Sequence, residues 1–291
     1  MKLGLFAINY GTCADPGRAV QVAQHAEAAG FESVWTGEHI VLPDPQPHGF
    51  SMPPSLPFLD TVVALTLIAA HTTTLRLGTG MILLPLRNPA VLAKELASVD
   101  VVSGGRLIAG FGSGYVSAEF ASSGVPMSER GARMNEHLRA LTALWAMEHP
   151  QYQGRWVSIQ GIDAQPRPVQ HPGPPIVLGG ESPAALRRAV TMANGWYGFG
   201  LTPAEAGQHI AVLRRLAQEH ERPAHLGRLE LTVTPIGPLN QAAINEYQDL
   251  GVDRLVLLPE PEASNDQRHA PVPVERILRN IDTTATAFLT G

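Results

Sequence analysis

The chain has 291 residues, of which 44% are hydrophobic and 16% charged, and its formal net charge is -5 at pH 7. This composition is typical of a globular protein and excludes a disordered chain. The mild acidity, without a block of Lys or Arg, argues against nucleic acid as a partner.

The single cysteine, Cys13, has no partner for an internal disulfide, and no Cys/His cluster has the spacing of zinc ligands. We therefore expect no bound metal and a cytoplasmic protein. The apolar run at residues 61–70 is too short to span a bilayer, and residues 1–9 lack the order of a signal peptide. We expect no membrane anchor.

Short apolar runs alternate with longer amphipathic ones along nearly the whole chain, which is the pattern of repeated βα units. Eight strands are predicted, and they begin at Lys2, Ser33, Leu75, Arg106, Pro175, Trp196, Leu229 and Arg254. Helix starts are indicated by Pro16, Pro89, Pro183 and Pro203, with Ser182 and Thr202 as N-caps. Because the strands are almost continuously apolar, both of their faces should be buried, as in a parallel sheet.

The repeat shows no obvious domain boundary over residues 1–291, which favours one closed α/β domain, a (β/α)8 TIM barrel, over an open doubly wound sheet. Two insertions interrupt it. Residues 39–59 carry six prolines and form a long loop after the second strand, and such loops are usually functional. Residues 149–174, between the fourth helix and the fifth strand, contain two short alternating runs that predict a small hairpin.

Glu38 and His39 stand side by side at the end of the second strand. In barrels of this kind, the loops after the carboxyl ends of the strands build the active site. Because imidazole titrates near neutrality and a neighbouring carboxylate can orient it, we interpret the two residues as an acid/base pair. The alternative is a structural salt bridge or a solvent-facing turn.

Glycines mark three further strands. Gly78 and Gly80 weaken the third strand unless the backbone bulges or approaches a ligand there, although barrel packing explains them equally well. Gly110, Gly112 and Gly114 surround Ser113 and offer backbone amides to a phosphate, without forming the dinucleotide fingerprint.

A strand that ends in Gly179 and Gly180 runs through Glu181 into a helix capped by Ser182. The free N–H groups at the start of that helix form a candidate anion site, and the alternative is a plain βα turn. Next to the fourth strand, Tyr115 is a candidate for contact with a ligand. Charged residues surround the start of the fourth helix, and we interpret them as an ion-pair network that orients the insertion there: Glu119, Arg130, Arg133 and Glu136.

Five segments in this order resemble the luciferase-like monooxygenase superfamily, which comprises flavin or deazaflavin enzymes on a (β/α)8 barrel. They are GEHIVLP (37–43), the run LGTGMILLP to GGRL (77–107), the run GFGSGY to LRAL (110–141), the run QPRPVQ to LRRA (165–189) and NGW (194–196). The likeness extends from about Lys2 to about Trp196, and the particular resemblance is to the oxidoreductases that depend on coenzyme F420.

The resemblance implies that His39 is the active-site histidine beside the redox ring, with Glu38 where F420-dependent relatives usually carry aspartate. It implies that Gly80–Met81 is a non-prolyl cis peptide that supports the ring. Two groups of residues would hold the ribityl and phosphate portion of the cofactor: Gly110, Phe111, Gly112 and Ser113, and Gly179, Gly180, Glu181 and Ser182.

Two positions depart from the superfamily's pattern. Tyr115 stands where the F420-dependent sugar-phosphate dehydrogenases carry a catalytic glutamate, so that chemistry does not transfer. Leu83 stands where some relatives place a threonine near the ring.

The sequence therefore predicts an F420-dependent oxidoreductase that moves a hydride between the C5 atom of the deazaflavin and an organic small molecule. The alternatives are an FMN-dependent monooxygenase that uses O2 and a non-catalytic barrel that binds a ligand. Apolar residues in the first insertion indicate a largely apolar substrate, and the alternative is that they cover the mouth of the barrel: Phe50, Met52, Leu56 and Phe58. The resemblance also implies a homodimer that pairs through the second and third helices.

Overall fold

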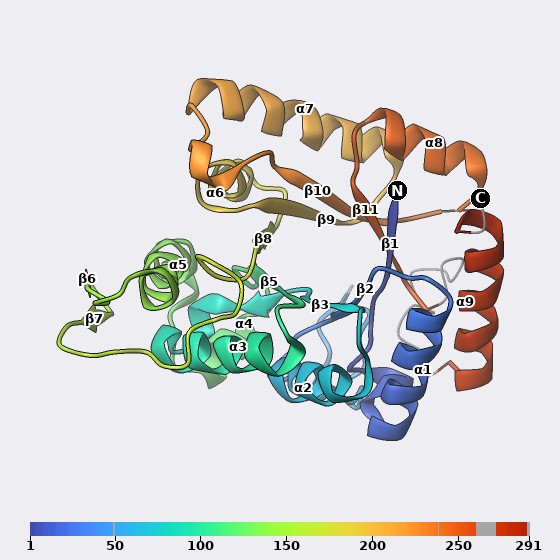
Figure 1. Ribbon diagram of the computed structural model, residues 1–291, viewed down its shortest axis with the longest axis horizontal. Helices are drawn as coiled ribbons and strands as arrows, with labels where there is room; N and C mark the ends of the chain where they lie inside the picture. Colours follow the sequence, from blue (N-terminus) through green and yellow to red (C-terminus); the bar gives the residue numbers. More distant parts are fainter. Residues whose placement is uncertain (49, 238, 260–271, 290–291) are drawn as a thin grey trace.

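The computed structural model describes residues 1–48, 50–237, 239–259 and 272–289. Its main sheet closes on itself, because β1 pairs with both β2 and β11 and because β3 pairs with β5. All of these pairings are parallel, and helices surround the strands (Figure 1). The predicted (β/α)8 barrel is confirmed.

All eight predicted strands are present. In the order of the chain they are β1 (Lys2–Leu5), β2 (Ser33–Thr36), β3 (Arg76–Thr79), β5 (Leu107–Gly112), β8 (Ile176–Gly179), β9 (Gly195–Leu201), β10 (Glu230–Pro235) and β11 (Arg254–Leu257). A short segment, β4 (Ile82–Leu83), follows β3 after the step at Gly80–Met81 and pairs with β5. The third predicted strand is therefore divided in two.

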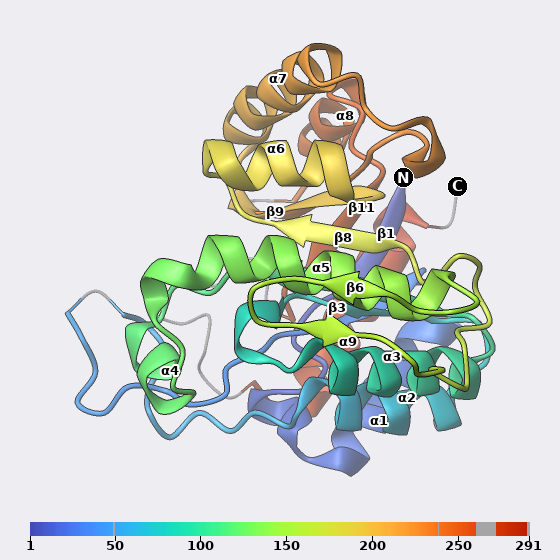
Figure 2. The same cartoon turned by 90° about the vertical axis from the view of Figure 1, so that its left-hand side faces the viewer.

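Helices follow the strands around the outside of the barrel (Figures 1 and 2). They are α1 (Pro16–Ala28), α2 (Thr61–His71), α3 (Pro89–Ser103), α4 (Ser117–Ser122), α5 (Arg130–Ala146), α6 (Pro183–Met192), α7 (Pro203–Glu219), α8 (Gln241–Asp249) and α9 (Val274–Phe288). The four predicted prolines each begin a helix, and Ser182 and Thr202 accept hydrogen bonds from the first turns of α6 and α7, as predicted. Within the part of the chain that the structure describes, no helix is both long and apolar enough to cross a bilayer.

Large aromatic side chains fill the inside of the barrel. The rings of Trp35 on β2 and Tyr197 on β9 lie 5.2 Å apart edge to face, although these strands are not neighbours in the sheet. A β-carbon on Gly78 would lie 2.2 Å from the Trp35 ring. Gly78 is therefore a packing glycine, needed because the neighbouring strand carries a tryptophan.

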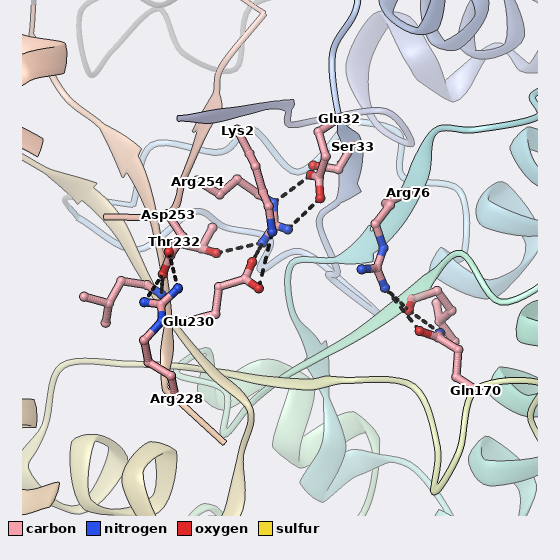
Figure 3. Close-up of polar contacts among 12 residues, drawn as sticks. Lys2, Glu32, Ser33, Arg76, Gln170, Arg228, Glu230, Thr232, Asp253 and Arg254 are labelled. Carbon is pink, nitrogen blue, oxygen red and sulfur yellow. Dashed lines mark hydrogen bonds and ion pairs between the residues drawn. The ribbon is translucent and has the colours of Figure 1, made fainter. Parts of the chain in front are cut away.

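A buried ion cluster closes the amino-terminal end of the barrel, opposite the end where an active site is expected (Figure 3). Arg254 at the start of β11 is 1% exposed and binds both carboxylate oxygens of Glu32, at 2.7 and 2.8 Å. It also pairs with Glu230, and its guanidinium lies 5.6 Å from the Trp35 ring. Arg254 thus neutralises two carboxylates, each of which lies at the start of another strand.

The two predicted insertions are present between the predicted elements. The first, residues 39–59, leaves the end of β2 and returns to the segment after β1, where Leu59 N–H donates to the Asn9 carbonyl at 2.9 Å. The second contains the predicted hairpin, β6 (Tyr152–Gln153) and β7 (Ser158–Ile159), outside α5 (Figure 2). Glu136 orients it by accepting three backbone N–H groups from residues 155–157.

Replacing Arg254 should destabilise the barrel much more than replacing an exposed arginine of the same region. Arg254→Leu removes a buried cation and leaves the partly buried carboxylates of Glu32 and Glu230 without it, so we expect the free energy of unfolding to fall by about 3 kcal/mol. Arg228→Leu is the matched control. Its ion pair with Asp253 is made by a 71% exposed side chain, and the loss should be about 1 kcal/mol or less. Equal losses in urea denaturation would contradict this account of the cluster.

Candidate active site

A cavity of about 740 Å³ lies at the carboxyl ends of the strands. Segments that follow β1, β2, β3, β5, β8 and β11 supply parts of its wall, and residues of β4, of β9 and of the first insertion complete it. The position is the one where barrels of this architecture build active sites. Its wall mixes aromatic and aliphatic side chains with a few polar groups.

Most of the predicted site residues lie in this one wall. They are Glu38, His39, Gly80, Met81, Gly112, Ser113, Gly179, Gly180 and Glu181. Three predicted residues do not lie in it: Gly110, Phe111 and Ser182. Phe111 is fully buried in the core cluster, and the side chain of Ser182 caps α6 by accepting the Ala185 N–H.

Gly110 has a packing role that the glycine spacing did not reveal. The Thr79 hydroxyl on β3 donates to the Gly110 carbonyl at 2.7 Å and accepts the Gly110 N–H at 2.6 Å. A β-carbon on Gly110 would lie 1.8 Å from the Thr79 carbonyl oxygen. Gly110 therefore permits close contact between strands, and its amide is not available to a phosphate.

The cis peptide implied by the resemblance is present between Gly80 and Met81. The Met81 side chain lies in a slot between β5 and β8 that glycines leave open. β-carbons on Gly112 and Gly179 would lie 3.2 and 3.1 Å from its Cβ and Cγ atoms. Gly112 and Gly179 therefore make room for the Met81 side chain in the cavity wall. This role differs from the phosphate binding that was predicted for them.

Glu38 points toward the third βα unit and is held there. Its carboxylate accepts the Leu83 N–H at 2.5 Å and pairs with Arg87, which also binds Asp60 at 2.8 Å. Burial raises the pKa of the Glu38 carboxyl, although the charge of Arg87 and the Leu83 N–H oppose this shift. These contacts are those of a structural ion pair, which was the alternative to an acid/base role.

His39 points to another side of the loop, toward α4. Its Nδ1 lies 3.3 Å from Glu119 Oε2, and the two side chains are 8% and 1% exposed. Glu119 Oε1 accepts the Ile40 N–H at 2.8 Å. Three aromatic rings surround the imidazole edge to face, those of Phe50, Phe58 and Tyr115, with centroids 5.5–6.3 Å away.

Glu119 is not part of the ion-pair network that was predicted around the start of the fourth helix. The carboxylate contacts His39 and Ile40, and the ion pair of Arg133 is made with Glu129. Glu119 lies 80 residues from His39 in the chain, and the packing of α4 against the loop after β2 brings them together. A carboxylate inside the short apolar helix SAEFAS was the one local sign that it needed a buried partner.

The polar end of the cavity is formed by Ser113 and Gly114 on one side and by Gly180 and Glu181 on the other. Within the described residues, no Lys or Arg lies in the cavity wall. An anionic group bound there would rely on backbone N–H groups and the start of α6. In the same part of the chain, no three His, Cys, Asp or Glu side chains form a possible metal site.

Residues 1–254 match the model of the luciferase-like monooxygenase family, and the chain belongs to that family. An uncharacterised protein of Mycobacterium tuberculosis is 28% identical over 246 residues, which cover 82% of this chain and 83% of the relative. The oxygenase component of a flavin-dependent trigonelline monooxygenase from Acinetobacter baylyi is 27% identical over 255 residues, which cover 87% of this chain and 61% of the relative.

Solved structures share the fold at low sequence identity. A monooxygenase from Streptomyces bottropensis superposes with a TM-score of 0.77 at 21% identity over 99% of each chain. An F420-dependent secondary alcohol dehydrogenase, solved with an F420-acetone adduct, gives a TM-score of 0.77 at 14% identity over 99% of this chain and 98% of that one. The family match makes the chain a luciferase-like protein. The solved structures that share its fold include both a monooxygenase and an F420-dependent enzyme.

Two glycines of β5 should respond differently to alanine. Gly110→Ala places a methyl group against the Thr79 backbone, which cannot move aside, so we expect a loss of more than about 3 kcal/mol in the free energy of unfolding. Gly112→Ala places it against the flexible Met81 side chain, so the loss should be about 1 kcal/mol while ligand affinity falls. Thermal unfolding and ligand titration of both variants test this, and a Gly110→Ala protein of native stability would refute the packing role.

Proposed function

We propose that this protein is a coenzyme F420-dependent oxidoreductase that moves a hydride between the deazaflavin C5 atom and an organic substrate. The observation that carries the proposal is one cavity whose wall contains His39, the cis Gly80–Met81 unit and a polar end rich in glycine. A deazaflavin or flavin ring, when bound, supplies the hydride chemistry.

The residues of the cavity fit a flat ring with an anionic tail. Met81, Phe6 and Tyr197 offer an apolar surface on which a ring can lie, with the imidazole of His39 in the same wall. Ser113 and the backbone around Gly114 and Gly180 would bind the tail without a cationic side chain. In this arrangement His39 exchanges a proton with the substrate, and Glu38 anchors the loop.

The first insertion would complete the substrate side of the cavity. Met52 and Phe58 lie in the wall, and the Phe58 ring stacks on Tyr10 with centroids 4.6 Å apart. Leu56 is buried, and Phe50 lies beside His39. We propose that a largely apolar small molecule fills this part and excludes water from the reacting atoms.

A flavin-dependent monooxygenase is the second candidate. The relative from Acinetobacter supports it, because that protein is named as the oxygenase component of a flavin-dependent monooxygenase. Fluorescence titration of the purified protein with F420 and, separately, with FMN distinguishes the two candidates. We expect the dissociation constant for F420 to be at least about tenfold lower than that for FMN, a difference of about 1.4 kcal/mol. Tight binding of FMN without binding of F420 would overturn the proposal.

The same titration includes a variant at the proposed proton-transfer group. His39→Ala should bind the preferred cofactor within about threefold of the native affinity, since one edge contact is lost. Its turnover with any substrate accepted by the native protein should fall by roughly 10²- to 10⁴-fold. Unchanged turnover would show that His39 takes no part in catalysis and would contradict its proposed role.

We also propose a homodimer that pairs through α2 and α3. These helices pack on each other outside the barrel and carry exposed valines: Val63, Val91, Val101 and Val102. Apolar side chains on adjacent exposed helices are typical of a subunit interface. Sedimentation at micromolar concentration should show a dimer, and the double variant Val63→Asp and Val102→Asp a monomer. A native protein that sediments as a monomer would contradict this assembly.

A further inference from the structure

We propose that Glu119 is the positioning residue of His39. Its carboxylate keeps a proton on Nδ1 of the imidazole, so that Nε2 is the nitrogen that gains or loses a proton at the cavity. This inference rests on the proposed role of His39 as the proton-transfer group. It holds for either cofactor, because it concerns only side chains of this chain.

The facing atoms of the Glu119 and His39 side chains have only each other as a possible polar partner among the described residues. Glu119 Oε2 and His39 Nδ1 are 3.3 Å apart, and both atoms are buried and form no hydrogen bond, with each other or with any other described residue. The other carboxylate oxygen is already used by the Ile40 N–H, which fixes the orientation of the carboxyl group. The distance is longer than that of a well-formed hydrogen bond, as is common for catalytic contacts before the substrate binds.

The electrostatics favour one arrangement of the imidazole. A neutral imidazole carries its proton on one nitrogen and a lone pair on the other. A lone pair on Nδ1 would face the buried carboxylate, leave two acceptors opposed and satisfy neither. A proton on Nδ1 satisfies the carboxylate in both the neutral and the protonated imidazole, and it places the lone pair of the neutral imidazole on Nε2.

Other groups around the imidazole do not compete with Glu119. Tyr115, which is 62% exposed, faces it from the segment between β5 and α4, and partial desolvation together with the charge of Glu119 raises the pKa of its hydroxyl, so it stays neutral near pH 7. Phe50 and Phe58 face it from the first insertion and carry no charge. Glu38, the preceding residue, binds Arg87 and the Leu83 N–H.

Nitrogen NMR of isotope-labelled protein without cofactor tests the proposal directly, with the His39 signals assigned from their loss in His39→Ala. We expect Nδ1 to carry a proton in both the neutral and the charged imidazole, and the lone pair of the neutral form to lie on Nε2. A neutral His39 whose Nδ1 is unprotonated in the native protein would overturn the proposal. A failure of F420 binding would leave this result unaffected and would count against the proposed cofactor alone.

Glu119→Gln should reverse the tautomer. The amide oxygen of the new side chain can still accept the Ile40 N–H, which turns the amide NH2 group toward Nδ1 as a donor. The neutral imidazole would then carry its proton on Nε2. Turnover should fall by roughly 10²- to 10⁴-fold at a nearly unchanged cofactor dissociation constant, because the nitrogen at the cavity has lost its lone pair.

Two further variants separate positioning from folding. Glu119→Asp keeps a carboxylate and should keep the Nδ1 proton and recover much of the turnover lost in Glu119→Gln. Glu136→Gln changes another buried glutamate, which accepts backbone N–H groups of the hairpin after α5, and should leave the His39 spectrum and turnover native. Equal tautomers in native protein and in Glu119→Gln, or equal loss of turnover in Glu119→Asp and Glu119→Gln, would contradict the inference.

Discussion

Two buried carboxylates fix the segment after β2, and the candidate site depends on them. Glu38 reaches from this segment to Arg87 and the Leu83 N–H, and Glu119 reaches into it from α4 to His39 and the Ile40 N–H. Buried charged groups hold one geometry because any other leaves them unpaired. The imidazole of His39 is thereby held in the cavity wall between two anchored neighbours, although a long insertion follows directly.

The fold and much of the site could be predicted from local features of the sequence. Apolar runs, helix-starting prolines and the caps at Ser182 and Thr202 each act within a few residues, and all of them were confirmed. The location of His39 in a common wall with Gly80, Gly112 and Gly180 also follows from the topology, because parallel strands end at one rim. The identity of the ligand that binds in this cavity stays a prediction.

The rest depends on contacts between distant segments, which spacing does not encode. Gly110 and Gly112 are indistinguishable in the sequence, yet the first packs against Thr79 and the second makes room for Met81. Glu38 and His39 are adjacent, yet one binds Arg87 and the other contacts Glu119. A motif therefore locates a site well, while the role of each residue depends on its partners across the barrel.

The central claim is that the barrel holds an imidazole beside a flat redox ring. A crystal structure of the protein with its preferred cofactor measures this most directly. The account predicts the ring on Met81 at the Gly80–Met81 unit, with His39 Nε2 facing the space beside the reactive ring carbon and the anionic tail at Ser113 and Gly180. A ring bound elsewhere, or a His39 side chain turned away from it, would contradict the account.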